Sequence, residues 1–598
     1  MMPLYGLKPI DVAMIVAYFA VVLAIGFWSS RQVKTETDFF LGGRRFGKGL
    51  LTMHWLCTGT HSEMAVQVAG ATARVGLGGI WYQWMWLFST PFYWLMAPVT
   101  RRLRVTTTGD FFRIRYGRGL EMLYTVVALL YFSLSIALLL RGAGAAISGA
   151  TGGAVPTETS VIALSILFST YVMAGGLVAA AYTDLLQGVM IIVLSLLLVP
   201  AGLGVVGGMA GLHAHLGPGM FAITAPPGAP EGDPWFVVTL SVLGLVGFAV
   251  QPHVMTATGS GKTETEARVG MVYGNFIKRL LTIAWAFTGL IALAAFPEVI
   301  AGLDPNSPPA RHASETLFGR AIQGFLGDGW RGLMIACLIA GVTSAETFMV
   351  GGSALFTRNL YVHAVPGRSD AHYLWIGRLA SGGLLVLGIL LALGAESLTQ
   401  LVVGSVKLIG LLGAAFWLGV VWRRANATAV WVSFLGSLLV WAIVGAESAS
   451  LAIPGIGPAA RALLAAGDAL RLRGLSQSVQ VMIMLAVEFG LMIFVSLITR
   501  PRDLSALGPF YARLHTPVGR EDEVRCPEPL PDLPESATLG LEGMALDYQR
   551  SSRFAYARLQ ELGLEVPRLT WFDWGGFLVA WILVGGLIGL LIWLAALR

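Results

Sequence analysis

Long apolar segments recur along almost the whole chain, separated by short polar loops. Each segment is roughly 20 residues long, which is enough for a helix to cross the ~30 Å hydrocarbon core of a bilayer. We therefore expect an all-α polytopic membrane protein with about fourteen transmembrane helices. The predicted spans are 10–28, 50–71, 78–99, 120–148, 159–178, 182–206, 235–257, 272–296, 325–357, 373–393, 398–421, 427–445, 478–498 and 571–596.

Basic residues gather in alternate loops, and their distribution predicts an orientation. The loop after the first span holds Arg31, Lys34, Arg44, Arg45 and Lys48, whereas residues 207–234 contain no Lys or Arg. Because positively charged loops stay on the cytoplasmic side, both termini should lie outside. We expect a multi-pass protein of the cell membrane, with the inner membrane of a bacterium as its location.

Composition excludes several classes of protein. Of 598 residues, 56% are hydrophobic and only 12% are charged, about half the charge of a soluble domain. The net charge of +6 comes from short loops between spans, so we expect no nucleic-acid partner. Residues 259–263 resemble the end of a phosphate-binding loop but lack the preceding strand and the correctly spaced first glycine. We expect a protein that is not an enzyme.

Two predicted spans are interrupted by polar residues. The span 50–71 contains Cys57-Thr58-Gly59-Thr60-His61-Ser62-Glu63, and the span 235–257 contains Gln251-Pro252-His253. Proline has no N–H and clashes with the preceding turn, which frees a carbonyl at membrane depth. Matching interruptions in two halves of a chain indicate the central site of a transporter. The two spans lie five apart, as an inverted five-plus-five repeat requires.

The span 325–357 carries hydroxyl groups at Thr343, Ser344 and Thr347. Thr343 and Thr347 are four residues apart and therefore share one face of a helix. Oxygens gathered in this way can hold a small hard cation. Alternatively, each hydroxyl can donate to a carbonyl one turn earlier, as membrane Ser and Thr often do.

Ionisable residues inside predicted spans have two interpretations. His61, Glu63 and Glu346 lie near the middle of their spans, which favours a position on the wall of a polar cavity. Asp184 and Lys278 lie nearer the ends, where a side chain can also extend to the membrane surface.

Three motifs resemble those of the sodium:solute symporter family: Phe39–Arg44, Ala174–Leu177 with Tyr182–Gly188, and Leu418–Asn426. The resemblance covers about residues 10–500 and implies the LeuT-type inverted-repeat fold, with one extra N-terminal and three extra C-terminal helices. The implied division is an N-terminal helix and inner loop at 1–49, a first repeat at 50–206, an outer loop at 207–234, a second repeat at 235–421, two additional helices at 422–499, a cytoplasmic linker at 500–569, and a C-terminal transmembrane helix at 570–598. Within the linker, residues 541–563 are expected to form an amphipathic helix.

The resemblance also implies a set of site residues. Sodium would be held by Cys57, Thr60, Ala340, Thr343 and Ser344, with Asp184 near the inner end of its exit route. The substrate cavity would lie between the two broken helices, lined by Gly59, Glu63, Met64, Gln83, Gln251, His253 and Lys278.

The implied function is sodium-coupled symport of a small organic solute by alternating access, with sodium as the coupling ion. In the sugar-transporting branch the positions of Met64 and Val402 carry polar or aromatic residues, and neither side chain here bonds a sugar hydroxyl usefully. A carboxylate or amino-acid-like solute is therefore expected over a sugar. The alternative is a non-transporting membrane sensor or scaffold on the same fold, with a cytoplasmic partner at 500–569.

Overall fold

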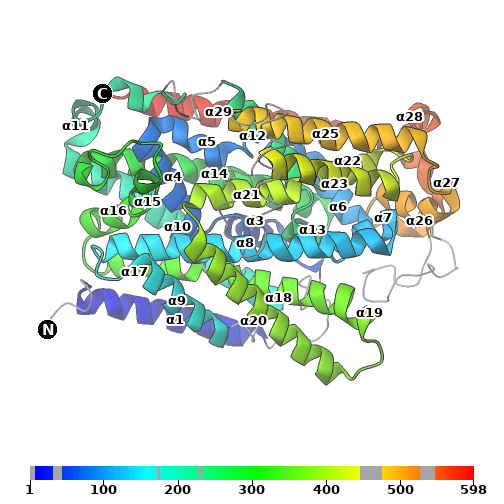
Figure 1. Cartoon of the computed structure of the whole chain (residues 1–598), viewed down its shortest axis with the longest axis horizontal. Coiled ribbons are helices and arrows are strands. Elements are labelled where there is room, and N and C mark those ends of the chain that lie inside the picture. Colours follow the sequence, from blue (N-terminus) through cyan, green and yellow to red (C-terminus); the bar gives the residue numbers. More distant parts are fainter. Residues whose placement is uncertain are drawn as a thin grey trace.

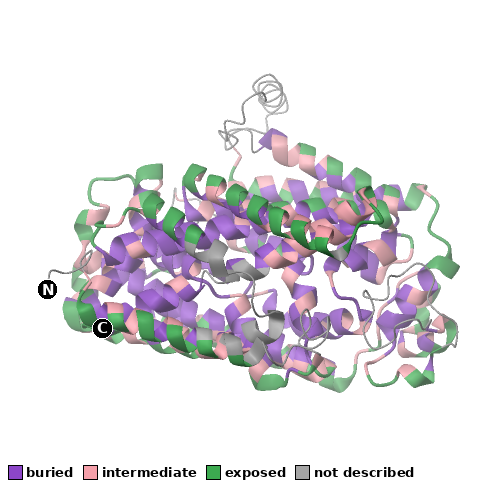
Figure 2. Cartoon of the chain, turned by 90° about the horizontal axis from the view of Figure 1, so that it is seen from below, coloured by how far each residue is buried: buried purple, intermediate pink, exposed green. Residues whose placement is uncertain are grey.

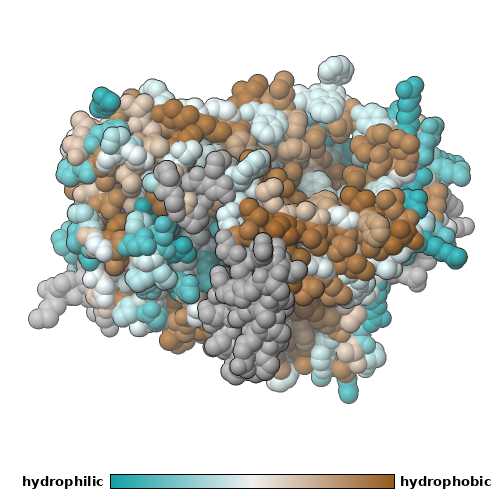
Figure 3. Space-filling model, turned by 45° about the horizontal axis from the view of Figure 1, so that its top comes forward, coloured by the Kyte–Doolittle hydropathy of each residue, from teal (hydrophilic) through white to brown (hydrophobic). Residues whose placement is uncertain are grey.

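The computed structural model describes residues 7–30, 44–171, 176–226, 229, 234–341, 344–444, 475–525 and 546–598. These residues form helices and four isolated β-bridges, without a sheet. Most helices run along the long axis of the molecule (Figure 1). Apolar side chains cover much of its middle, and polar ones gather towards its two ends (Figure 3). The predicted all-α membrane class is confirmed.

The main helices follow the chain in this order: α1 (Pro9–Ser30), α3 (Lys48–Thr58), α4 (Ser62–Val75), α5 (Trp81–Trp84), α6 (Thr90–Leu103), α7 (Thr108–Tyr116), α8 (Arg118–Ala150), α9 (Thr157–Tyr171), α10 (Gly176–Val206), α11 (Gly208–His215), α12 (Pro234–Phe248), α13 (Pro252–Gly259), α14 (Glu264–Ala295), α15 (Pro308–Glu315), α16 (Leu317–Phe325), α17 (Trp330–Gly341), α18 (Ser344–Leu355), α19 (Val362–Ala364), α20 (Asp370–Gly394), α21 (Leu398–Gly410), α22 (Gly413–Val421), α23 (Ala427–Val444), α25 (Gln477–Ile498), α26 (Leu504–His515), α27 (Tyr548–Ser551), α28 (Ala557–Glu561) and α29 (Trp571–Ala596).

The number of membrane spans differs from the sequence-based count. Among the described residues, eight helices are long and apolar enough to cross a bilayer, or nine if α12 and α13, bent by 61°, form one span. The predicted count of fourteen is not confirmed. Breaks account for part of the difference, because they divide the predicted spans 50–71 and 325–357 into the shorter pairs α3–α4 and α17–α18.

The core of the molecule is built around α8 and α14, because 72% and 83% of the residues in their apolar 18-residue stretches are buried. Buried residues concentrate in the interior of the bundle (Figure 2). Small residues let α14 approach its neighbours closely: a Cβ added at Gly274 would lie 2.7 Å from the Thr52 carbonyl, and one at Gly289 would lie 2.3 Å from the Ala69 carbonyl. Close backbone contact of this kind drives helix association in membranes.

The two ends of the molecule carry different elements. α1 begins and α29 ends at one end, and α26, α27 and α28 lie at the other (Figure 1). This arrangement agrees with termini that share one side of the membrane. That this side is the outside remains a prediction.

The helix α29 is fastened to the bundle by polar contacts near its start. The buried Arg268 of α14 forms an ion pair with Asp573 of α29. The Trp94 indole donates to the Phe572 carbonyl at 3.3 Å, and Gly576 lies directly against the Trp94 ring. The last helix is therefore bound to α6 and α14 through specific side chains.

The amphipathic helix expected at 541–563 is wrong as a single helix. Residues 541–545 lie outside the described residues, and from Tyr548 onward the chain forms the short helices α27 and α28 with a turn between them. The Ser552 hydroxyl donates to the Gln549 carbonyl, and Ala555 forms a β-bridge with Pro567. These local bonds turn the backbone away from a continuous helix.

A single buried carboxylate, Glu565, holds this segment against the membrane domain. Glu565 accepts hydrogen bonds from His515 of α26 at 2.5 Å and from the Tyr548 hydroxyl at 2.7 Å, and it pairs with Arg423 beyond the end of α22. Burial by itself raises the pKa of Glu565, but the hydrogen bonds from His515 and Tyr548 outweigh it and lower the pKa to about 2. We call these four side chains the Glu565 anchor.

We predict that Glu565→Gln loosens α26–α28 at neutral pH, at a cost of about 3 kcal/mol for breaking a buried pair. Because the folded-state pKa is lowered, the carboxylate stabilises the fold above pH 4.5, and this contribution disappears as the pH falls towards about 2. The difference in protease resistance of residues 500–569 between wild type and variant should shrink over the same range. The exposed Glu561→Gln is the control, and equal resistance at pH 7 would contradict the anchor.

Candidate functional site

The break between α3 and α4 leaves an unusual group of buried polar atoms. The Thr60 N–H bonds to the Cys57 carbonyl at 3.0 Å, and the helix resumes at Ser62. Within the described structure, four consecutive side chains have a buried polar atom without a hydrogen-bond partner: Thr60 Oγ1, His61 Nδ1, Ser62 Oγ and Glu63 Oε2. Such atoms are costly to leave unpaired, so the break has the chemistry of a binding site.

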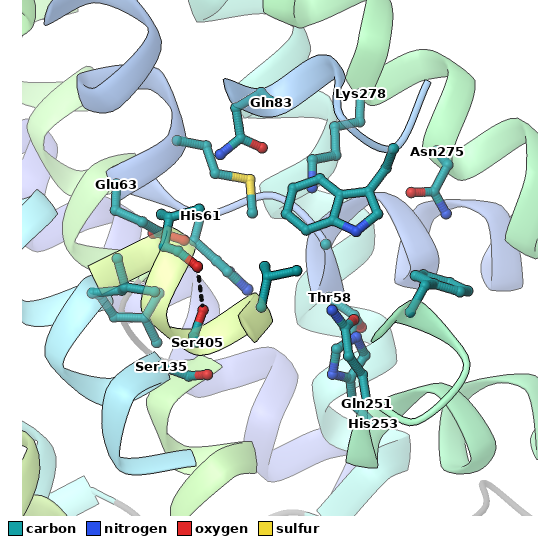
Figure 4. A pocket seen from close by; sticks show the side chains of 18 of the residues that line it. Thr58, His61, Glu63, Gln83, Ser135, Gln251, His253, Asn275, Lys278 and Ser405 are labelled. Carbon is teal, nitrogen blue, oxygen red and sulfur yellow. Dashed lines mark hydrogen bonds between the residues drawn. The ribbon is translucent and has the colours of Figure 1, made fainter. Parts of the chain in front are cut away.

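The break between α12 and α13 is stabilised by a side chain from another helix. Pro252 begins α13, and the Val250 carbonyl just before it accepts a hydrogen bond from the Tyr124 hydroxyl of α8 at 2.9 Å. The Val250 carbonyl is thereby satisfied without a ligand. The side chains of Gln251 and His253 lie beside Thr58 at the edge of the cavity (Figure 4).

A cavity of about 90 Å³ lies between the two breaks, and its volume is enough for several water molecules. All seven residues predicted to line the substrate site do line this cavity: Gly59, Glu63, Met64, Gln83, Gln251, His253 and Lys278. Figure 4 shows Lys278 and Gln83 on one side and Ser135 and Ser405 on the other. The structure brings these residues together; their contact with a solute remains a prediction.

Sequence reasoning missed several residues of the cavity wall. They are mainly polar side chains on α8, α14 and α21 and aromatic rings, namely Ser135, Asn275, Arg279, Ser405, Trp86, Tyr93, Tyr131 and Phe348. Asn275 could have been found, because it precedes Lys278 by three residues and so shares its helix face. The aromatic residues carry no comparable signal in a chain this apolar.

Lys278 and Arg279 place two cationic side chains at the cavity. Lys278 is 4% exposed, so it does not extend to the membrane surface, and its Nζ lies 5.7 Å from the centre of the Trp86 ring. Within the described structure no ion pair joins it to Glu63, whose Oε2 has no hydrogen-bond partner. Arg279 donates to the Gln83 carbonyl at 3.1 Å and lies against the same indole. The Lys278 ammonium thus remains available to a ligand.

Gln83 of the cavity wall and Gln67, which lines a second and smaller pocket, form a pair whose side chains are only half satisfied. The Gln83 amide nitrogen donates to the Gln67 oxygen at 2.8 Å. The remaining atoms, Gln83 Oε1 and Gln67 Nε2, are buried and have no partner among the described residues. The pair therefore offers one free acceptor and one free donor close together.

The predicted sodium ligands are partly described. The end of α17 touches the first break, because a Cβ added at Gly341 would lie 3.3 Å from the Ser62 nitrogen. The Ala340 carbonyl faces Gln187 of α10, whose amide donates to it at 3.4 Å. Thr343 and the side chain of Ser344 lie outside the described residues. The assignment of sodium to Cys57, Thr60, Ala340, Thr343 and Ser344 stays a prediction.

Asp184 is held by α3 and does not extend to the membrane surface. Its side chain is buried, with Oδ2 2.8 Å from His54 Nδ1, and its carbonyl accepts a hydrogen bond from Cys57 Sγ at 3.1 Å. Sequence reasoning missed His54, although it lies three residues before Cys57 on the same helix face. The contact ties α10 to the helix that forms the first break.

The sodium:solute symporter family model matches residues 39–436. The chain belongs to this family. It is 26% identical to sodium/myo-inositol cotransporter 2 of Oryctolagus cuniculus, over 73% of this chain and 70% of that protein. It is 27% identical to sodium/glucose cotransporter 4 of Homo sapiens, over 64% of this chain and 60% of that protein.

The fold is similar to that of a solved Na⁺-coupled sialic acid symporter in a substrate-bound, outward-open state. The TM-score is 0.63 at 16% identity, and the match covers 83% of this chain and 99% of that one. The LeuT-type fold implied by the sequence motifs is thereby confirmed. Family membership supports a multi-pass membrane transporter in which sodium is the coupling ion.

We predict that the double variant Thr343→Ala with Ser344→Ala loses sodium-dependent thermal stabilisation, because two hydroxyl ligands are removed while the backbone carbonyls remain. Sodium affinity should fall at least tenfold. Ser353→Ala is the matched control, since the Ser353 hydroxyl of α18 donates to the Val350 carbonyl and has a purely structural bond. Unchanged sodium dependence in the double variant would place the ion elsewhere.

Proposed function

We propose that the chain couples sodium to the transport of a small, neutral, polyhydroxylated solute of the sugar or cyclitol class. Solute and sodium would bind around the cavity between the two breaks and be released together by alternating access. The unpartnered Gln83 Oε1 at the cavity wall carries this proposal, because a solute hydroxyl group can donate to it.

Other groups at the cavity support recognition of hydroxyls. Asn275 donates to the carbonyl one turn earlier, which leaves its side-chain oxygen as an acceptor. The hydroxyls of Ser135 and Ser405 also donate to carbonyls of their own helices and can still accept. The Trp86 and Tyr93 rings add apolar surface. The relatives named for myo-inositol and glucose agree with this class of solute.

This proposal departs from the expectation of a carboxylate-bearing solute. That expectation rested on Met64 and Val402, which line the cavity but form no useful bond to a hydroxyl. The amide and hydroxyl groups of Gln83, Asn275 and Ser405 can supply hydrogen bonds that these two positions lack.

A carboxylate-bearing solute is nevertheless the second candidate, favoured by one observation. The cavity wall carries the cations Lys278 and Arg279 against a single carboxylate, Glu63. The free Lys278 ammonium can bind a carboxylate through a charge-assisted hydrogen bond. The two solute classes also differ in coupling: one sodium moved with a neutral solute carries charge and gains about 2.3 kcal/mol per 100 mV, whereas one sodium with one carboxylate does not.

A ligand screen on the purified protein separates these functions. We expect myo-inositol or a hexose to raise the melting temperature in sodium but not in choline buffer, and to enter proteoliposomes faster when the interior is negative. Stabilisation by a monocarboxylate or an amino acid, with no response to polyols, would favour the second candidate. Sodium binding without uptake of any solute would favour a sensor or scaffold.

Lys278→Met distinguishes the two solutes in a single variant. For a neutral solute we expect affinity to fall by about tenfold or less, the value of one ordinary hydrogen bond; for a carboxylate, the loss of a charge-assisted bond should exceed that. The melting temperature should stay within a few degrees, because no ion pair is broken. Lys407→Met, a lysine of α21 away from the cavity wall, is the control. An unchanged affinity would remove Lys278 from the site.

A further inference from the structure

The membrane span Leu398–Val421 contains a joint that divides it into α21 and α22. α21 ends at Gly410, α22 begins at Gly413, and Leu411 and Leu412 lie between them. α21 contributes Val402, Ser405 and Val406 to the cavity wall, whereas no residue of α22 lines it. The joint thus separates a half that faces the cavity from a half that does not.

A buried carboxylate from α25 binds the first turn of α22. Glu488 is 0% exposed, and its Oε1 accepts a hydrogen bond from the Ala414 N–H at 2.8 Å. The N–H groups of a first turn have no partner inside their own helix, and the positive end of the helix dipole favours an anion there. The second oxygen, Oε2, is buried and has no partner in the described part of the chain.

The joint also lies against α12, the helix that leads into the second break. A Cβ added at Gly413 would lie 2.1 Å from Val246 Cγ1, and one added at Gly247 would lie 3.7 Å from the Gly410 Cα. The contact at Gly413 leaves no room for a side chain, and the one at Gly247 is an ordinary packing contact. α25 runs beside α22 and α23 (Figure 1), and it lies outside the two predicted repeats.

We propose that Glu488 is a positioning residue for alternating access. It fixes the start of α22 on α25, so that α21 can change its tilt at Leu411–Leu412 while α22 stays in place. A carboxylate is rare in a membrane span and costly there. The proposed function explains why the carboxylate is present despite this cost: it holds α22 in place while the cavity-lining helix α21 moves. The wall formed by Val402, Ser405 and Val406 then moves as one unit, independently of the Glu565 anchor at the other end of α22.

Hydrogen–deuterium exchange on the full-length protein in nanodiscs tests this role, with sodium as the only added ligand. Glu488→Met keeps the length of the side chain but removes both oxygens, and Glu488→Ala serves if the first variant does not fold. Glu488→Gln retains one acceptor oxygen. Ser437→Ala is the control, because Ser437 donates to the Met484 carbonyl one turn earlier on α25 and does not touch the joint.

We expect amides 413–416 to exchange at least tenfold faster in Glu488→Met, and within threefold of wild type in Glu488→Gln and Ser437→Ala. In wild type, sodium should change exchange in 398–410 but not in 414–421; in Glu488→Met the change should extend into 414–421. Equal exchange at 413–416 in all variants would overturn the proposal. A sodium-dependent change of exchange in both 398–410 and 414–421 of the wild type would also overturn it. A wild-type protein with no sodium response anywhere would instead count against sodium coupling, and the exchange at 413–416 would still decide whether Glu488 anchors α22.

Discussion

A broken helix inside a membrane must find new partners for the backbone groups it frees, because hydrocarbon offers none. Three of the breaks in the described structure meet this constraint in different ways. At α12–α13, the Tyr124 hydroxyl bonds the Val250 carbonyl. At α21–α22, Glu488 accepts the Ala414 N–H. At α3–α4, the side chains around the break keep unpaired polar atoms. At the α3–α4 break the unpaired atoms belong to four consecutive residues, which supports the proposal that a ligand binds there.

Charged side chains inside the bundle also need partners, as the freed backbone groups do. Arg268, Arg423 and Asp184 each have a partner of opposite charge or an imidazole, and each partner lies far away in the sequence. These contacts join α10 to α3, α14 to α29, and the end of α22 to the segment around Glu565. Lys278 has aromatic surroundings and no such partner in the described chain. An ion whose charge is left available beside a cavity is suited to binding, whereas the paired ions are suited to holding the fold.

Sequence patterns predicted the fold class and the interruptions in α3–α4 and α12–α13, because glycine, proline and clustered polar residues stand out within apolar spans. The family resemblance placed seven residues around one cavity, including Gln83 and Lys278, which lie on neither break. The patterns could not predict His54 or Glu488 as partners, because a contact between distant helices leaves no mark in local spacing. The single helix expected at 541–563 failed because hydrogen bonds from serines and a bridge to Pro567 turned the chain.

The ion pair between Arg268 and Asp573 has a consequence for how the protein is made. The two residues lie 305 positions apart, so Arg268 is synthesised long before its partner exists. At 5–20 residues per second, the ribosome needs on the order of 15 to 60 s to synthesise the intervening chain. During that time the guanidinium group requires water, lipid headgroups or an insertion factor as a temporary partner. Assembly of the bundle around α14 is therefore completed only after the last helix has been translated.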